Sequence, residues 1–262
     1  MPSIAVVQGA SRGIGLQFCR TLLQRTEVNV IATCRCPDQA LDLNCLYKEH
    51  KERLNVMKMD VTQEDAIKET AEMVEQQFKK VDLLINCAAM LHPSGRGETS
   101  LRDVSFEGVQ ATLATNTIGP LLMAKYFSPM LSKGSGSFGL HSSNKKETHS
   151  GILVNMSARV GSISDNGLGG WYSYRMSKSA LNMATRNLSI ELRRRSKGKV
   201  ICIALHPGTV NTDLSRPYHR NVPKEKLFST LHSVECMMAV ISKLTLMDSG
   251  KYFAFDGTKI PF

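Results

Sequence analysis

Short apolar runs rich in Val and Ile alternate with amphipathic segments along nearly the whole chain, and this alternation limits the possible folds more than any other feature. Seven such runs are bounded by turn residues, as buried parallel strands are. They are Ile4–Val7, Val28–Thr33, Leu54–Met59, Val81–Asn86, Ile152–Met156, Val200–Leu205 and Tyr252–Phe255. The segments between them predict right-handed crossovers. We therefore expect an α/β chain with a doubly wound, seven-stranded parallel sheet and helices on both faces.

The longer intervening segments predict helices. Apolar residues recur at helical spacing after Thr62, and Thr62 followed by Asp65 predicts a capping box at the start of that helix. A possible kink at Pro120 lies within the longest helical pattern. The expected helices span Gln63–Phe78, Leu101–Leu131, Gly170–Arg195 and Thr230–Met247.

Two polar stretches interrupt this pattern. Lys133–Ser150 is rich in Gly and Ser, which predicts a mobile surface loop and not a linker, since strands continue on both sides. Asp213–Phe228 contains two prolines and several basic residues, and it follows the sixth strand, where an active-site lid could lie. We expect residues 1–262 to form a single domain.

The composition limits the class of protein. The 262 residues include seven Cys without Cys-x-x-Cys spacing, which argues against a zinc site or a disulfide framework and predicts a reducing, cytoplasmic location. No apolar run approaches the roughly 20 residues of a membrane span. A strand that starts at Ile4 leaves no room for a signal peptide in this sequence. Neither a metal nor a membrane partner is expected.

The net charge of +10 leaves two interpretations open. Its densest cluster, Arg193–Lys199, lies at a predicted helix end, where cations complement the helix dipole. A solvated helix end is favoured over a polyanion-binding patch, because the other charges are dispersed. We expect no nucleic-acid partner, although the excess charge suits phosphorylated small molecules.

A glycine-rich turn joins the first strand to a helical run. It comprises Gly9, Ala10, Ser11, Arg12, Gly13, Ile14 and Gly15. Glycines allow a pyrophosphate close to the backbone, and the helix N-terminus offers unpaired N–H groups. A tight strand–helix connection is the alternative. In this position we favour a dinucleotide site and therefore a Rossmann fold.

The end of the second strand indicates which dinucleotide binds. An acidic residue about 20 positions after the glycines would favour NAD. The chain instead has Arg35 there, and Arg12 lies within the turn. Two guanidinium groups would stabilise a 2′-phosphate. The cofactor expected is NADP(H), with a solvated Arg35 as the alternative.

Tyr174 and Lys178 are four residues apart in a predicted helix, so their side chains share a face. A phenol is a poor acid at neutral pH unless its anion is stabilised, and an ammonium group can do so. The pair is a candidate proton donor with its activator. A half-buried Tyr beside a solvated Lys is the alternative.

With these motifs in place, the chain resembles the short-chain dehydrogenase/reductase family over nearly its full length. The motifs are Gly9-x-x-x-Gly13-x-Gly15, Asn86-Cys-Ala-Ala89, Asn116, Tyr174-x-x-x-Lys178 and Pro207-Gly208. The segments Ser157–Asn166 and Tyr252–Pro261 are similar to the sniffer and C-factor branch of carbonyl reductases.

The resemblance implies a role for each matching position. Tyr174 would protonate the carbonyl oxygen beside the nicotinamide, and Lys178 would lower the pKa of Tyr174 and hold the nicotinamide ribose. Asn116 would widen its helix and seat a water that relays protons to Lys178. Asp60 and Val61 would flank the adenine. The remaining cofactor contacts implied are Asn86 and Ala88 on the ribose, and Pro207, Gly208, Val210 and Thr212 at the nicotinamide. Strand ends, core amides and turns are the structural alternatives for these residues.

One position departs from the family pattern. The pattern Asn-x-Ser-Ser ends the fifth strand, and its second Ser holds the substrate carbonyl. This chain has Ala158 there, after Asn155 and Ser157. Ser157 or Ser162 is a candidate for the missing hydroxyl, or the site works poorly. Strand alternation directs Ser157 away from the position of residue 158.

The leading hypothesis is an NADPH-dependent reductase of small carbonyl compounds. Met90, Leu91, Trp171 and Tyr172 are expected near the substrate, with Asp213–Phe228. The resemblance implies a homo-oligomer, dimer or tetramer, formed through the two long helices. The alternative, favoured by Ala158, is a dinucleotide-binding signalling or scaffold protein with little turnover.

Overall fold

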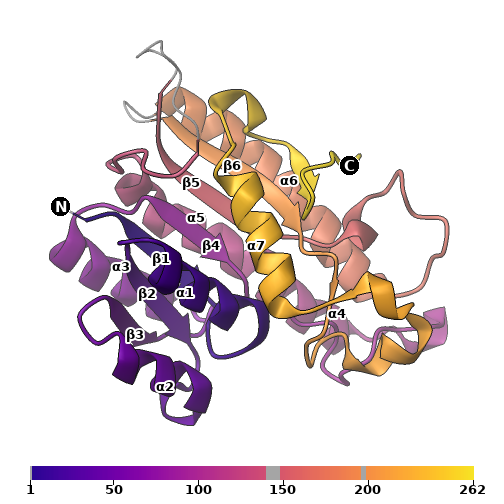
Figure 1. The fold of residues 1–262 in the computed structure, drawn as a ribbon. Helices are drawn as coiled ribbons and strands as arrows, with labels where there is room; N and C mark the ends of the chain where they lie inside the picture. Colours follow the sequence, from indigo (N-terminus) through magenta and orange to yellow (C-terminus); the bar gives the residue numbers. More distant parts are fainter. Residues whose placement is uncertain (1, 140–147, 196–198) are drawn as a thin grey trace.

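A computed structural model describes residues 2–139, 148–195 and 199–262 of the chain. Within these ranges the main sheet has seven parallel strands in the order β3-β2-β1-β4-β5-β6-β9 (Figure 1). The seven predicted strands are confirmed, with ends displaced by up to three residues. They are β1 Ile4–Gln8, β2 Asn29–Cys34, β3 Leu54–Lys58, β4 Leu83–Asn86, β5 His149–Met156, β6 Lys199–His206 and β9 Tyr252–Ala254. Two short strands, β7 Thr209–Val210 and β8 Leu227–Phe228, pair separately.

Helices cover both faces of the sheet, as the alternation of strands and helices predicts. One face is covered by α1 Gly13–Arg25, α2 Leu41–Glu49 and α7 Thr230–Ile241. The other is covered by α3 Glu64–Phe78, α5 Gly119–Leu131 and α6 Tyr172–Arg195. A further helix, α4 Phe106–Leu113, packs on α6 beyond the sheet (Figure 1). This is a doubly wound Rossmann arrangement.

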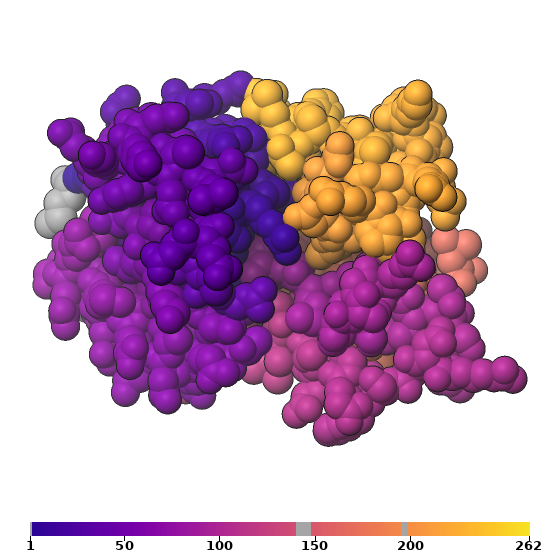
Figure 2. Space-filling model, turned by 90° about the horizontal axis from the view of Figure 1, so that it is seen from below, coloured from indigo at the N-terminus to yellow at the C-terminus, as the bar shows by residue number. Residues whose placement is uncertain are grey.

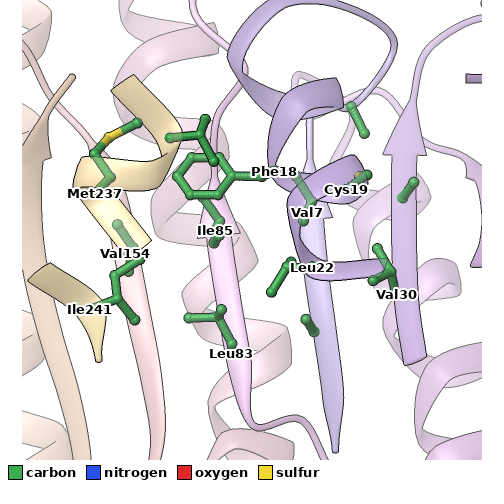
Figure 3. Packing of buried hydrophobic residues seen from close by; sticks show 14 of the residues in the cluster. Val7, Phe18, Cys19, Leu22, Val30, Leu83, Ile85, Val154, Met237 and Ile241 are labelled. Atoms are coloured by element: carbon green, nitrogen blue, oxygen red, sulfur yellow. The ribbon is translucent and has the colours of Figure 1, made fainter. Parts of the chain in front are cut away.

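Alternation along each strand divides the core into two layers. On β1, Ala5 and Val7 belong to the layer of α1 and α7, whereas Ile4 and Val6 belong to the layer of α3 and α5. Figure 3 shows Phe18 of α1 lying over the strands of the first layer. Because both faces are covered, the central strands are apolar at most positions, which explains the apolar runs in the sequence.

The helix predicted over Leu101–Leu131 begins later than expected, at Phe106, and it is irregular in its middle, as expected at Asn116. Ser100 caps a separate 3₁₀ turn, and α4 begins only after Ser105, whose side chain accepts the N–H of Gly108. Between α4 and α5 the chain forms a π-helical segment, Ala114–Ile118. The irregularity therefore lies before Pro120 and contains Asn116.

Three other details differ from the sequence expectations. The last long helix ends at Ile241 instead of Met247, because a separate 3₁₀ turn with its own capping box begins after Thr245. The short helix α2 was not expected. The capping box predicted at Thr62 is absent, since the Thr62 hydroxyl donates to Asp60 Oδ1 (2.8 Å) and Gln63 is the N-cap.

The predicted surface loop Lys133–Ser150 is only partly described, since residues 140–147 lie outside the described ranges. Its flanks are ordered: Phe138 is buried in the core, and His149 and Ser150 belong to β5. The basic cluster Arg193–Lys199 includes residues 196–198, which are also outside those ranges. No helix in the described part of the chain is long and apolar enough to cross a membrane.

Candidate active site

The candidate residues converge at the edge of the sheet where the parallel strands end. The glycine turn follows β1, Asn86 ends β4, and Pro207 follows β6. Figure 2 shows this side as a hollow between the N-terminal part of the chain, the segment 213–228 in orange and the segment after β4 in magenta. Ligands of doubly wound sheets bind at this edge.

Glycines bring three backbone segments into close contact at the turn. Gly9 has φ 83°, and a side chain there would place its Cβ 2.5 Å from the backbone nitrogen of Ala88. A Cβ on Gly15 would lie 2.2 Å from the carbonyl oxygen of Gly9. Helix α1 begins with no side-chain cap and no acidic residue in its first turn. Its free N–H groups and the missing side chains suit a phosphate.

The two arginines are exposed at the same edge. Gly9 N–H and Ala10 N–H both donate to Thr33 O of β2, which fixes the turn against the strand that precedes Arg35. Arg35 is exposed, whereas Arg12 Nη1 pairs with Asp213 Oδ2 at 3.0 Å. Arg216 Nη2 contacts the same carboxylate at 2.5 Å. Arg12 is thus tied to the segment after β7, a contact that the sequence did not predict.

The predicted adenine and ribose residues fall into two groups. Asp60 is partly exposed, and its Oδ1 accepts from Thr62 N–H at 2.9 Å, so Oδ2 remains for a ligand. Val61, in contrast, is 4% exposed and packs in the core against Gly119. The Asn86 side chain donates to Asn155 Oδ1 at 2.8 Å, which bridges β4 and β5. The side chains of Val61 and Asn86 therefore have structural roles, and Ala88 presents its backbone to the glycine turn.

The segment after β6 packs against the glycine turn. A Cβ on Gly13 would meet Thr212 Cγ2 at 3.4 Å, so Thr212 lies directly beside the turn. Gly208 has φ 80° and packs against Phe228, while Pro207 O accepts from Ser233 Oγ at 2.7 Å. Val210 is buried. These contacts place Thr212 at the edge of the hollow.

Tyr174 and Lys178 lie buried on one face at the start of α6. The Lys178 Nζ is 5.6 Å from the centre of the Tyr174 ring and donates to Met156 O at 2.8 Å. Burial raises the pKa of Tyr174, and it lowers the pKa of Lys178 to about 8. The lowering of the Tyr174 pKa expected from Lys178 is therefore absent in this structure, because burial dominates. Tyr174 is a protonated donor at neutral pH.

Asn116 connects three segments around this pair. Its Oδ1 accepts from Met90 N–H at 2.8 Å, and its Nδ2 donates to Met90 O at 2.7 Å and to Ser177 Oγ at 3.0 Å. The π-helical turn directs the amide toward the segment after β4 and toward α6. The expected local widening of the helix at Asn116 is confirmed.

Comparison with known proteins identifies the family. A model of the short chain dehydrogenase family matches residues 3–223.

The chain belongs to the short chain dehydrogenase family.

Two carbonyl reductases have similar structures over 100% of both chains. The NADPH-bound enzyme from chicken fatty liver is 33% identical with a TM-score of 0.85, and carbonyl reductase Sniffer of D. melanogaster is 29% identical, also with 0.85. The C-signal protein of Myxococcus xanthus is 34% identical over 182 residues, covering 70% of this chain and 93% of that protein. The protein is therefore an oxidoreductase of the short chain dehydrogenase family that resembles carbonyl reductases.

In this short chain dehydrogenase, the hydrogen bonds distinguish the two predicted replacements for the serine missing at position 158. Ser157 Oγ donates to Asn182 Oδ1 at 2.7 Å, so its proton is used within the protein. Ser162 is buried, and its Oγ accepts from Asp165 N–H at 3.1 Å, which leaves its own proton available. Of the two predicted candidates, the hydrogen bonds favour Ser162.

Four residues make contacts at the site that the sequence pattern did not predict, although Asp213 and Tyr218 belong to the segment expected near the substrate. Gln8 Oε1 accepts from Ala88 N–H at 3.1 Å and fixes the segment beside the glycine turn. Asp213 pairs with Arg12, Glu98 accepts from Ser173 N–H at the start of α6, and the Tyr218 hydroxyl accepts from Gly97 N–H in the segment after β4. Each of them contacts a residue at least 75 positions away in the sequence. No local pattern marks such contacts.

Proposed function

We propose that the protein is an NADPH-dependent carbonyl reductase that forms an alcohol from an aldehyde or ketone. The observation that carries this proposal is the buried Tyr174–Lys178 pair beside the π-helical Asn116, at the edge of the sheet where the glycine turn lies. The reductases from chicken and D. melanogaster with the same fold support it.

The residues present fit an NADP(H) molecule. The close contacts at Gly9 and Gly15 leave no room for side chains, and the first turn of α1 is uncapped. Arg12 is exposed in the glycine turn, and Arg35 is exposed directly after β2. The glycine turn would hold the pyrophosphate and the arginines the 2′-phosphate. When bound, NADPH supplies a hydride to the carbonyl carbon.

The chain's own residues supply and replace the proton. Tyr174 keeps its proton at neutral pH because burial raises its pKa, and it releases that proton to the carbonyl oxygen as negative charge develops there. The phenolate that remains is stabilised by the ammonium group of Lys178, one helical turn away. With a pKa of about 8, Lys178 is mostly protonated near neutral pH and can return a proton to Tyr174.

The central test is NADPH oxidation with a panel of reactive aldehydes and ketones. Tyr174→Phe should lower turnover by about 10²–10⁴-fold, the usual contribution of a general acid. Tyr47→Phe is the matched control, since Tyr47 is an exposed tyrosine on α2, and the turnover of this variant should stay near that of the wild type. Binding of NADPH without turnover of any carbonyl by the wild type would contradict the proposal.

A separate test addresses the choice of NADPH over NADH. NADPH should raise the melting temperature more than NADH does, and Arg35→Ala should remove the difference by removing the cation for the 2′-phosphate. Lys68→Ala, which removes an exposed cation from α3, should leave the difference unchanged. Equal shifts with both cofactors in the wild type would refute the assignment of Arg35.

A second candidate function is a dinucleotide-binding signalling protein with little turnover. Ala158 favours it, because an oxyanion donor is typically worth about 3 kcal/mol, and so does the similarity to C-signal. The intact Tyr174, Lys178 and Asn116 favour the reductase. The same carbonyl panel separates the two, since a signalling protein would bind NADPH without consuming it.

The proposed enzyme acts as a homo-oligomer in the cytoplasm. All seven cysteines are free, which suits a reducing compartment. Large apolar side chains are exposed along the helices that carry Asn116 and Tyr174, namely Ile118, Leu121, Met176, Met183 and Ile190. Light scattering should give the mass of a dimer or tetramer, and Met183→Glu should reduce it to that of a monomer. A monomeric wild type would rule out this assembly.

A further inference from the structure

The residue just before α6 has an unusual backbone. Trp171 has φ 49°, in the left-handed region, and it follows Gly169 and Gly170 with φ 66° and 63°. Glycine adopts this conformation freely, but a bulky side chain does so at a cost in free energy. Such an outlier persists only where its surroundings hold it, and it is therefore a reason to look for a function.

Hydrogen bonds hold Trp171 on both sides. Its N–H donates to Glu98 O at 2.6 Å, and its carbonyl accepts from Arg175 N–H at 2.8 Å. Arg175 Nε also donates to the carbonyls of Gly169 and Gly170, each at 3.1 Å. The left-handed turn is thus fixed by residues of α6 and of the segment after β4.

The result is a row of three aromatic rings that ends at the proton donor. The Trp171 indole contacts the Tyr174 ring edge-on with centroids 6.2 Å apart, and the Tyr218 ring with centroids 4.5 Å apart. Gly97 backs the indole, since a Cβ at Gly97 would lie 2.6 Å from Trp171 Cδ1. The Tyr218 hydroxyl accepts from Gly97 N–H at 2.7 Å.

This row of rings limits which substituents of a substrate carbonyl fit next to Tyr174. A carbonyl oxygen that accepts the Tyr174 proton places its substituents near the neighbouring rings. Stacked or edge-on contacts with flat rings are favourable, whereas a polar substituent would lose its water there without gaining a partner. Trp171 and Tyr218 are both partly exposed, so part of each ring surface is free to contact a substrate.

We propose that Trp171 and Tyr218 form an aromatic wall that determines specificity, favouring carbonyl compounds with an aryl or conjugated ring beside the carbonyl carbon. This inference rests on the proposed reductase function and names its substrate class. Tyr218 acts through its ring, and its hydroxyl serves to anchor the segment 213–228 to Gly97.

Three methyl ketones test the wall. Acetophenone carries a phenyl ring, cyclohexyl methyl ketone a group of similar size without aromaticity, and butanone a small alkyl group. In NADPH oxidation, kcat/KM should fall in that order, with acetophenone at least tenfold above butanone. Equal values for acetophenone and cyclohexyl methyl ketone would overturn the aromatic proposal.

Variants at position 218 separate specificity from structure. Tyr218→Leu keeps an apolar side chain but removes both the ring and the hydroxyl that bonds Gly97, and it should lower the acetophenone-to-butanone ratio about tenfold. Tyr218→Phe keeps the ring and loses only the bond to Gly97, and it should retain the ratio. A parallel loss for both ketones in Tyr218→Leu would mean that Tyr218 is merely structural, and it would overturn the proposal.

A binding measurement keeps this result distinct from the function itself. Trp171 is the single tryptophan of the chain, so its fluorescence reports directly on the wall. Without NADPH, acetophenone should change this emission saturably in the wild type, much less so in Tyr218→Leu, and butanone should not. Saturable binding of acetophenone without turnover would support the aromatic wall and refute the reductase function. Turnover without a preference for acetophenone and without an emission change would support the reductase function and refute the wall.

Discussion

The two sides of the candidate site are built in opposite ways. The cofactor side, which comprises the glycine turn Gly9–Gly15 and the end of β2, consists of backbone groups in close contact with exposed cations around them. The substrate side, which comprises Trp171, Tyr174 and Tyr218 with their partners, consists of side chains held by one another. The cofactor side depends on glycines, which have no side chains, whereas the substrate side depends on particular side chains. Added atoms should therefore damage the cofactor side, whereas the substrate side should respond to the particular group at each position.

Gly15→Ala should have the largest effect on the cofactor side. The new Cβ would meet the backbone of Gly9, which no side-chain movement can relieve. Overpacking typically costs about 1–3 kcal/mol, so we expect NADPH affinity to fall about 10–100-fold. Titration of NADPH fluorescence measures it. Gly167→Ala is the control, since a Cβ there meets nothing within 4 Å. Equal NADPH affinities in Gly15→Ala and Gly167→Ala would contradict the view that close backbone contacts in the glycine turn form the cofactor side.

Ala158→Ser should have the largest effect on the substrate side. Residue 158 has extended backbone and is partly exposed, so a serine fits there. A hydroxyl donor to the carbonyl is worth about 10²–10³-fold in kcat, and we expect a rise of about 10-fold or more. Ser162→Ala in the wild type should lower kcat if Ser162 supplies the hydroxyl now. If neither substitution changes kcat, no hydroxyl is needed to hold the carbonyl and our description of the substrate side is wrong.

Lys178→Met tests how much the buried ammonium group of Lys178, which lies between the two sides, lowers the stability of the protein. The fall of the Lys178 pKa from 10.5 to about 8 means that the unfolded chain binds more protons between these values. The contribution of Lys178 to the free energy of unfolding should therefore rise with pH from about 8 to about 10, and burial of the ammonium is a cost below pH 8. Lys178→Met should be more stable than the wild type by about 2 kcal/mol at pH 7.

Urea unfolding of both proteins at pH 7 and at pH 9.5 measures this effect, as the stability difference should shrink at the higher pH. The difference between wild type and variant isolates Lys178 from the other groups that titrate there. A difference that stays constant with pH would show that Lys178 is not charged and buried as its contacts indicate.

Asp213→Asn should have the smallest effect, and it tests the contact between the cofactor side and the segment 213–228. The side chain of Arg12 is 73% exposed, and exposed ion pairs are worth about 0–1 kcal/mol. Freeing Arg12 should tighten NADPH binding at most about fivefold, and salt should reduce the gain. Asp42→Asn, on the exposed surface of α2, is the control. Weaker binding in Asp213→Asn would show that the pair supports the cofactor instead of competing for Arg12.

Much of the cofactor side could be predicted from the sequence because it is local. A strand, a glycine turn and a helix follow one another within 25 residues, and each is determined by neighbours in the chain. The same holds for Tyr174 and Lys178, which one helical turn brings together. The family resemblance added Asn116, whose π-helical turn a helical pattern alone does not reveal.

The sequence by itself determined the alternating sheet, the glycine turn and the helix that carries the acid, since hydrophobic period and glycine placement act over a few residues. Only the tertiary structure decided how side chains are used. It pairs Ser157 with Asn182, buries Val61 under Gly119, ties Arg12 to Asp213, and sets Trp171 between Tyr174 and Tyr218. Most of these contacts join residues far apart in the chain. Their partners depend on how the strands and helices pack, which no local pattern encodes.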